Sequence, residues 1–276
     1  MKKFIYNGLG FFLVFLIVSH AGPLYLFYTE KYKNSVAGSD IYYSISKSKK
    51  KNKSKKLLLG DSVANQMFTN TVYNGPINSL ACNKAIGLAG QFILLDSYLK
   101  AGNKVDTVYL AFNPFSFKNN LNDLFTYHYF LKPFYTKEYE NLFTKTVMDQ
   151  IHKIPYVSIR RYPYILTSNW GPGFISKDKA KYKFLSPISQ EYLLKIKDLS
   201  IKYNFDLLII PVPVNISKKH ELEKIHRDEL VISDLKKEFD DYFEKIIYLH
   251  DSNFVDGVHL KNPGNIQKFY HDKFLK

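Results

Sequence analysis

Short apolar segments alternate with segments of helical composition from Leu57 onward, and this alternation restricts the fold more than any other feature. The apolar run Leu57-Leu58-Leu59 stops at Gly60, and a helix-compatible stretch begins at Val63. Further strands are expected at 79–83, 105–112, 205–212 and 246–249, and further helices at 90–101, 137–154, 189–203, 220–243 and 268–275. The pattern predicts a parallel sheet covered by helices.

The tripeptide Gly60-Asp61-Ser62 lies where the first expected strand gives way to a helix. A serine at such a turn lies at the carboxyl edge of the sheet, where open α/β folds bind ligands. The N–H groups of the incoming helix point at the same place. This placement suits Ser62 as a nucleophile. The alternative is that Asp61 or Ser62 only caps the helix, a common use of both residue types.

A stretch near the C-terminus supplies the partners that a nucleophilic serine needs. Such a serine requires a base within hydrogen-bond reach, and the base requires a carboxylate that holds its tautomer. Asp256 and His259 are spaced i and i+3, so their side chains can lie side by side on one turn, with the far ring nitrogen free to face Ser62. The alternative is a loop histidine in a turn rich in Gly, Asn and Pro.

An early Gly-Asp-Ser combined with a late Asp-x-x-His resembles the SGNH (GDSL) hydrolase family, and the resemblance covers roughly residues 57–264. It implies an α/β fold with a three-layer α/β/α flavodoxin-like arrangement, and acyl transfer through a covalent serine ester. In that mechanism Ser62 attacks an ester carbonyl, His259 takes and returns the proton, and Asp256 orients His259. The resemblance implies acyl esters of cell-envelope glycans, O-acetyl groups above all, as substrates for hydrolysis or for transfer.

Two intermediate stretches are similar to the family blocks that supply the oxyanion hole. The glycine-containing loop at 83–91 implies Gly90 as a backbone N–H donor beside that of Ser62, with Gly87 as the alternative. The strand end before Pro114 implies Asn113 as a side-chain donor. Asn113 lacks the family's usual Gly-x-Asn-Asp setting, and a turn-forming role is the alternative.

The segment of about 114–187 interrupts the alternation and is rich in aromatic residues. The chain holds 22 Tyr and 22 Phe, which concentrate after Asn113. An insertion at the carboxyl end of a strand would bring aromatic side chains close to the nucleophile, where they can line a substrate cleft. The alternative is that they pack a helical subdomain onto the sheet, and His128 is expected to belong to that packing.

The N-terminal segment 4–28 carries no charged residue and is long enough to cross a bilayer, which takes about 20 residues. A cleaved signal peptide with its core at Leu9–Val18 is the alternative, but the apolar run continues beyond that core. We expect a retained single-pass anchor within residues 1–30. Lys2 and Lys3 favour an N-terminus in the cytoplasm, and hence a domain outside it.

Residues 31–56 are expected to form a basic stalk that leads to a catalytic domain at 57–276. Seven lysines between Lys47 and Lys56 account for half of the net charge of +14, so the folded part is only mildly basic. They weaken the predicted orientation without reversing it. A run of lysine and serine is typical of a solvated linker and no nucleic-acid-binding motif is present, so nucleic acid is not an expected partner.

No cofactor or metal ion is expected, because the eight histidines are scattered without metal-ligand spacing. The single cysteine, Cys82, excludes an intrachain disulfide. The expected partners are the membrane and an acylated envelope glycan or another ester, and a membrane-bound acyl-transfer partner is left open. The alternative function is a non-catalytic acyl-glycan-binding or scaffold component of a polysaccharide-assembly complex.

Overall fold

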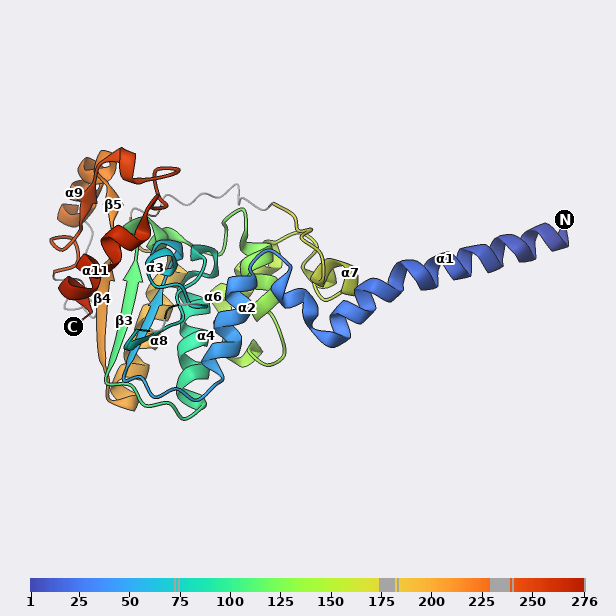
Figure 1. The fold of residues 1–276 in the computed structure, drawn as a ribbon, viewed down its shortest axis with the longest axis horizontal. Helices are drawn as coiled ribbons and strands as arrows, with labels where there is room; N and C mark the ends of the chain where they lie inside the picture. The colour runs from blue at the N-terminus through green and yellow to red at the C-terminus, as the bar shows by residue number, and fades with distance from the viewer. Residues whose placement is uncertain are drawn as a thin grey trace.

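A computed structural model shows an α/β domain with a four-stranded parallel sheet, preceded by a long N-terminal helix (Figure 1). The structure describes residues 1–71, 73, 75–173, 182, 184–228, 239 and 241–275. The strands are β1 (Lys56–Gly60), β2 (Ile77–Ser79), β3 (Thr107–Phe112), β4 (Asp206–Pro211), β5 (Val214–Asn215) and β6 (Tyr248–Leu249). The α-helices are α1 (Lys2–Thr29), α2 (Ser39–Ser48), α3 (Ser62–Met67), α4 (Gly87–Lys100), α5 (Lys132–Phe134), α6 (Lys145–Lys153), α7 (Pro163–Leu166), α8 (Pro187–Tyr203), α9 (Lys219–Asp228) and α11 (Pro263–Phe274). The shorter helical turns are η1 (Lys31–Asn34), η2 (Lys84–Ile86), η3 (Pro114–Lys118), η4 (Tyr127–Leu131), η5 (Glu140–Leu142), η6 (Val157–Ile159), η7 (Ile216–Lys218) and η9 (Asp251–Asn253).

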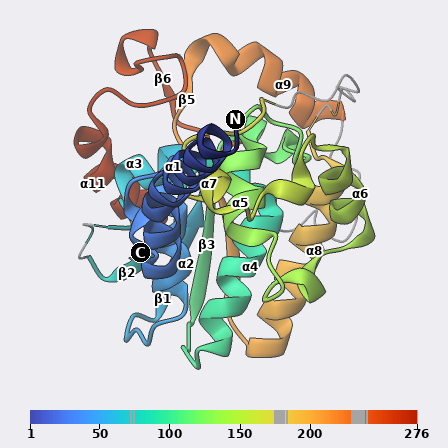
Figure 2. The ribbon, with the colours of Figure 1, turned by 90° about the vertical axis from the view of Figure 1, so that its right-hand side faces the viewer.

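The main sheet has the strand order β2-β1-β3-β4, and every neighbouring pair is parallel. The leucines of β1 divide between its two faces. Leu57 and Leu59 join a core with α4 and α8, whereas Leu58 joins a second core with α3 and α11. Figure 2 shows these two helix pairs on opposite sides of the strands. Burial on both faces explains why β1 is a continuous apolar run and not an alternating one.

Two of the expected strands differ from the structure. The segment 79–83 was predicted as a strand, but β2 ends at Ser79. The N–H groups of Leu80 and Cys82 still bond to carbonyls of β1 and extend the pairing irregularly. The segment 246–249 contains β6, which pairs with β5 in a separate two-stranded sheet. The chain after β6 nevertheless returns to the carboxyl edge of the main sheet. There Tyr270 of α11 donates to the carbonyl of Pro211, the last residue of β4, at 3.0 Å.

Residues 31–56, predicted as a basic stalk, are not a solvated linker throughout. Helix α2 lies within this range, and Ile41 is fully buried in the core beneath it. Lys47 donates from Nζ to the carbonyl of Ser79 at 3.0 Å, and burial lowers the pKa of this lysine. The segment therefore packs against the domain, because its apolar residues recur at helical spacing.

The aromatic residues of the segment 114–187 mostly form core, which supports the packing alternative. Phe117 and Phe184 make a ring cluster with Phe239 and Tyr242, and all four side chains are buried. Buried aromatic rings stabilise a core by their large contact area as well as by edge-to-face contacts. These rings are therefore not available to line a substrate cleft.

Helix α1 is the one helix of the described residues that is long and apolar enough to cross a membrane, with a mean hydropathy of 1.9. None of its residues is buried. Its second half contacts the domain, where Leu26 and Phe27 pack on a small cluster that includes Tyr32 and Leu166. The helix is thus joined to the domain by packing as well as by the chain.

His128 and Lys132 lie about one turn apart in the insertion, on η4 and at the start of α5. Lys132 is only 6% exposed and donates from Nζ to the carbonyl of Ser168 at 2.8 Å. Burial lowers the pKa of Lys132 to about 8. The Nδ1 atom of His128 is buried and has no hydrogen-bond partner among the described residues. Burial and the nearby charge of Lys132 lower the pKa of His128 to about 4.

This environment predicts an acid sensitivity of folding. The pKa of His128 is about 4 in the folded protein against an ordinary value of 6.5, so the unfolded chain binds more protons between these pH values. The contribution of His128 to the free energy of unfolding is therefore lost as the pH falls from about 6.5 towards 4. We expect His128→Gln to reduce the loss of stability between pH 7 and pH 4.5, measured by thermal unfolding in detergent. The exposed His152→Gln serves as the control, and an identical pH dependence in wild type and His128→Gln would contradict the expectation.

Candidate active site

Ser62, His259 and Asp256 form a continuous chain of hydrogen bonds. The Ser62 hydroxyl lies 2.9 Å from Nε2 of His259, and Nδ1 of His259 lies 2.7 Å from Oδ2 of Asp256. A carboxylate can only accept, so Nδ1 carries the proton and Nε2 is left to accept from the serine. The structure thus brings together the three residues that the sequence predicted, across 197 positions between Ser62 and His259.

The loop that carries His259 is held in shape by Asp256. Oδ1 of Asp256 accepts from the N–H groups of Val258 at 3.0 Å and His259 at 2.8 Å, while Oδ2 holds the imidazole. These bonds to His259 and Val258 lower the pKa of Asp256 to about 2, so it is a carboxylate at neutral pH. Gly257 has a φ of 79°, which only glycine adopts without strain, and it lets the chain turn back between the two residues.

Gln66 attaches this loop to the helix of the nucleophile. It lies one turn after Ser62 on α3, and its Oε1 accepts from the N–H of Leu260 at 2.9 Å. Its Nε2 donates to the carbonyl of Leu260 at 3.4 Å. Leu260 follows His259 directly. The two bonds between the Gln66 side chain and the Leu260 backbone therefore hold the base close to the helix of the nucleophile.

Asp61 is the most heavily bonded side chain of the site. Its Oδ1 accepts from the N–H groups of Val63 at 3.0 Å and Ala64 at 3.4 Å, which caps α3. Its Oδ2 accepts from the N–H of Asn113 at 2.7 Å and from the hydroxyl of Ser116 at 2.8 Å. The side chain is buried, and burial raises its pKa while the four donors oppose that rise.

The cap leaves Ser62 free for another role. Asp61 occupies the N-cap position, so Ser62 is the first residue of α3, and its N–H forms no hydrogen bond with another described residue. The position before Asp61 requires a glycine. A Cβ at Gly60 would lie 2.6 Å from the Cβ of Ala64 and 2.7 Å from the carbonyl oxygen of Ala111. The capping alternative is thus met by Asp61, while Ser62 faces His259.

The site lies where the order of the sheet reverses. The chain leaves β1 for β2 on one side and then crosses to β3 on the other side of β1. Ser62 follows β1 and Asn113 follows β3 directly, so both lie at the carboxyl ends of adjacent strands. Such a switch point leaves a crevice between the two outgoing loops, and ligands of open α/β sheets bind there.

The two glycines proposed as oxyanion donors do not present a free N–H group. Gly90 is the fourth residue of α4, where the helical N–H pairs with the carbonyl of the residue before the helix, Ile86. It is needed for packing, because a Cβ would lie 2.6 Å from the Cβ of Ile86. Gly87 has a φ of 56° and donates its N–H to the carbonyl of Lys84. Among the described residues, no side chain caps the N–H groups of Leu88 and Ala89 in the first turn of α4.

The structure shows the turn-forming role of Asn113, and it leaves the oxyanion role as a prediction. Its Oδ1 accepts from the N–H of Phe115 at 3.0 Å and starts η3, which is the turn-forming role. Its backbone N–H is bound to Asp61. The amide NH2 of the same side chain takes no part in these two bonds and remains as a donor at the strand end.

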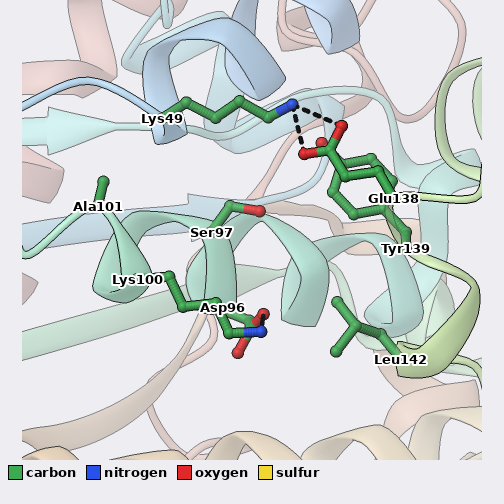
Figure 3. Close-up of a pocket in the computed structure, with 8 residues that line it drawn as sticks. All are labelled: Lys49, Asp96, Ser97, Lys100, Ala101, Glu138, Tyr139 and Leu142. Atoms are coloured by element: carbon green, nitrogen blue, oxygen red, sulfur yellow. Dashed lines mark hydrogen bonds and ion pairs between the residues drawn. The ribbon is translucent and has the colours of Figure 1, made fainter.

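The cavity in Figure 3 lies away from this site. It has a volume of about 310 Å³, and its walls come from α4, from Lys49 and from the residues before α6. Lys49 forms an ion pair with Glu138 at 2.6 Å across it, and Lys100 pairs with Asp96 at 2.7 Å. Ser97 is the one serine that lines this cavity. No histidine lines the cavity with it. The lining of this cavity therefore offers no Ser–His pair like that of Ser62 and His259.

We expect Asp61→Asn to destabilise the domain by about 1–3 kcal/mol, the usual cost of a buried donor without an acceptor. The amide can replace one carboxylate oxygen, but its NH2 then faces N–H donors of α3 or Asn113. Thermal unfolding in detergent measures the change, with the exposed Asp251→Asn as the control. Equal stability of Asp61→Asn and wild type would show that the four bonds are not needed.

Sequence reasoning missed Ser116 and Gln66. The signal for Ser116 was its position just after a strand end, and the signal for Gln66 was its helical spacing from Ser62. Among the described residues, no group of three or more His, Cys, Asp or Glu side chains is placed to hold a metal ion. No protein-family model matches the chain, and no curated protein or solved structure matches it either.

Proposed function

We propose that this protein is a serine ester hydrolase or acyltransferase of the SGNH (GDSL) type, acting on O-acyl esters of cell-envelope glycans. The observation that carries the proposal is the pair of contacts of 2.9 Å from Ser62 to His259 and 2.7 Å from His259 to Asp256. Nucleophile, base and orienting carboxylate are the three parts that acyl transfer through a serine ester requires.

The reaction proceeds in two halves. The Ser62 oxygen attacks the ester carbonyl carbon while Nε2 of His259 takes the hydroxyl proton, and the resulting imidazolium is stabilised by Asp256. The bond to the alcohol oxygen then breaks, His259 returns the proton to that oxygen, and the acyl group remains on Ser62. In the second half water or a sugar hydroxyl gives its proton to His259 and attacks the acyl carbon. The bond from that carbon to the Ser62 oxygen then breaks, and His259 returns the proton to Ser62.

Two donors at the switch point support stabilisation of the oxyanion. The free N–H of Ser62 and the amide NH2 of Asn113 lie on the loops after the carboxyl ends of adjacent strands. Loss of one such donor costs roughly 3–4 kcal/mol of transition-state stabilisation in a serine protease. We propose the N–H of Leu88 or Ala89, in the first turn of α4, as a third donor. Gly90 packs against Ile86 and is not proposed as a donor.

The fold that goes with this proposal is the three-layer flavodoxin-like sandwich. Its supports are the parallel strand order β2-β1-β3-β4, which matches the start of the 2-1-3-4-5 order, and the cores on the two faces of β1. In that arrangement the nucleophile follows the first strand and the base comes from the last loop.

The proposed substrate follows from exposure and from the anchor. The side chains of His259 and Asp256 are 36% and 54% exposed, so a bulky polymer can reach the base without entering a closed cavity. We place α1 across the cell membrane with the domain outside the cytoplasm, on the strength of Lys2 and Lys3 before an apolar span. An anchored domain meets a surface polymer far more often than a dilute soluble ester, because tethering raises effective concentration.

The direction of the reaction is tested by one comparison in cells. Ester-linked acetate on surface glycan is measured in wild type and in a strain whose chromosomal gene carries Ser62→Ala, with Ser252→Ala as the control. We expect the Ser62→Ala strain to differ from wild type: a loss of acetate identifies transfer to the glycan, and a gain identifies hydrolysis. No change in any ester-linked acyl group would overturn the glycan-ester assignment.

A further inference from the structure

Large exposed side chains gather in the segment Tyr156–Trp170, which contains α7. Tyr156, Ile159, Tyr162 and Trp170 are 62%, 42%, 49% and 44% exposed, in contrast to the buried rings of the same insertion. Three of the four are Tyr or Trp, which combine an apolar ring with a polar group. Side chains of this kind are enriched where a protein meets the headgroup region of a bilayer.

This segment also lies against α1. The hydroxyl of Tyr162 lies 3.3 Å from Nε2 of His20, and the hydroxyl of Tyr164 donates to the carbonyl of Ser19. The rings of His20 and Tyr164 meet edge to face with centroids 4.6 Å apart. Figure 1 shows α7 on the side of the domain from which α1 projects.

The position of these contacts along α1 sets their depth. A hydrocarbon core takes about 20 helical residues, so a span that starts at Phe4 ends near Pro23. Ser19 and His20 lie within the last turn and a half of that span. The part of α7 that touches them is therefore at the outer edge of the hydrocarbon core, and the exposed side chains beside it are at headgroup level.

Positive charge accompanies the aromatic side chains. Lys153 and Arg161 are exposed, and neither forms an ion pair with another residue of the described part of the chain. Basic side chains at a membrane surface are attracted by anionic lipid headgroups.

We propose that the segment Tyr156–Trp170 is a second membrane contact, which binds the headgroup region of an anionic phospholipid bilayer beside α1. It rests on α1 as a membrane span, and it does not depend on the proposed catalysis. Two contacts fix the orientation of the domain, whereas a single flexible tether would not.

This orientation determines where the candidate active site lies above the membrane. Figure 1 shows α3 and α11 on the flank of the domain opposite α7. Ser62 begins α3, so docking through the segment Tyr156–Trp170 holds the nucleophile away from the lipid, across the width of the domain. The orientation therefore favours an ester carried by a polymer that extends from the membrane over an ester at the lipid surface.

Trp170 is the one tryptophan of the chain, so its fluorescence reports on this contact alone. We expect full-length protein in vesicles of phosphatidylcholine and phosphatidylglycerol to lose Trp170 emission when the lipids carry bromine near the headgroup end of the acyl chains. Bromine near the chain ends should quench less, because the segment lies at the interface and not in the hydrocarbon centre.

A variant pair separates lipid contact from general effects. Ile159→Ser should reduce the quenching, whereas Ile216→Ser, which replaces an isoleucine of similar exposure (49%) on η7, should leave it unchanged. Resistance to alkaline extraction reports on α1 independently. Unquenched Trp170 in protein that resists extraction would overturn the second contact while leaving the anchor intact, and extraction of the protein would overturn both.

Discussion

The buried carboxylate of Asp61 joins the turn after β1 to the turn after β3. It caps α3 through two N–H groups, and it binds the first residue after β3 and the hydroxyl of Ser116 through its other oxygen. These four bonds hold the turn after β1 against the turn after β3. A buried carboxylate without such donors would strongly destabilise the fold, so the turn geometry and the burial of Asp61 depend on each other. This arrangement fixes the position of Ser62, and the bonds of Gln66 to Leu260 bring the His259 loop against it.

Much of this arrangement was predictable because its signals are local in the sequence. The run of leucines before Gly60 predicts β1, and the tripeptide Gly60-Asp61-Ser62 predicts the turn that follows it. The spacing of Asp256 and His259 allows their contact within one turn, and the structure has it at 2.7 Å. The contact between Ser62 and His259 joins residues 197 positions apart, so no local pattern predicts it. It was predicted from chemistry, because a nucleophilic serine needs a base.

The features that the sequence did not predict depend on tertiary packing. Gly90 was expected to supply an oxyanion donor. However, α4 begins at Gly87, three residues earlier than its apolar face suggested, so the N–H of Gly90 takes part in the hydrogen bonds of the helix. The stalk was inferred from its lysines, yet Ile41 buries α2 against the core. Buried and exposed aromatic residues of the insertion look alike in composition. Only their positions in the fold separate the core cluster around Phe117 from the exposed segment Tyr156–Trp170.

The central claim is that Ser62 is an activated nucleophile, and covalent labelling tests it most directly. A fluorophosphonate reacts with a serine whose hydroxyl proton can pass to a neighbouring base. Purified wild-type protein should carry the label on the peptide that contains Ser62. The label should be absent from Ser62→Ala, and it should persist in Ser252→Ala, which alters an exposed loop serine next to His250. Folded wild-type protein that takes up no label, or equal labelling of Ser62→Ala and wild type, would contradict the account.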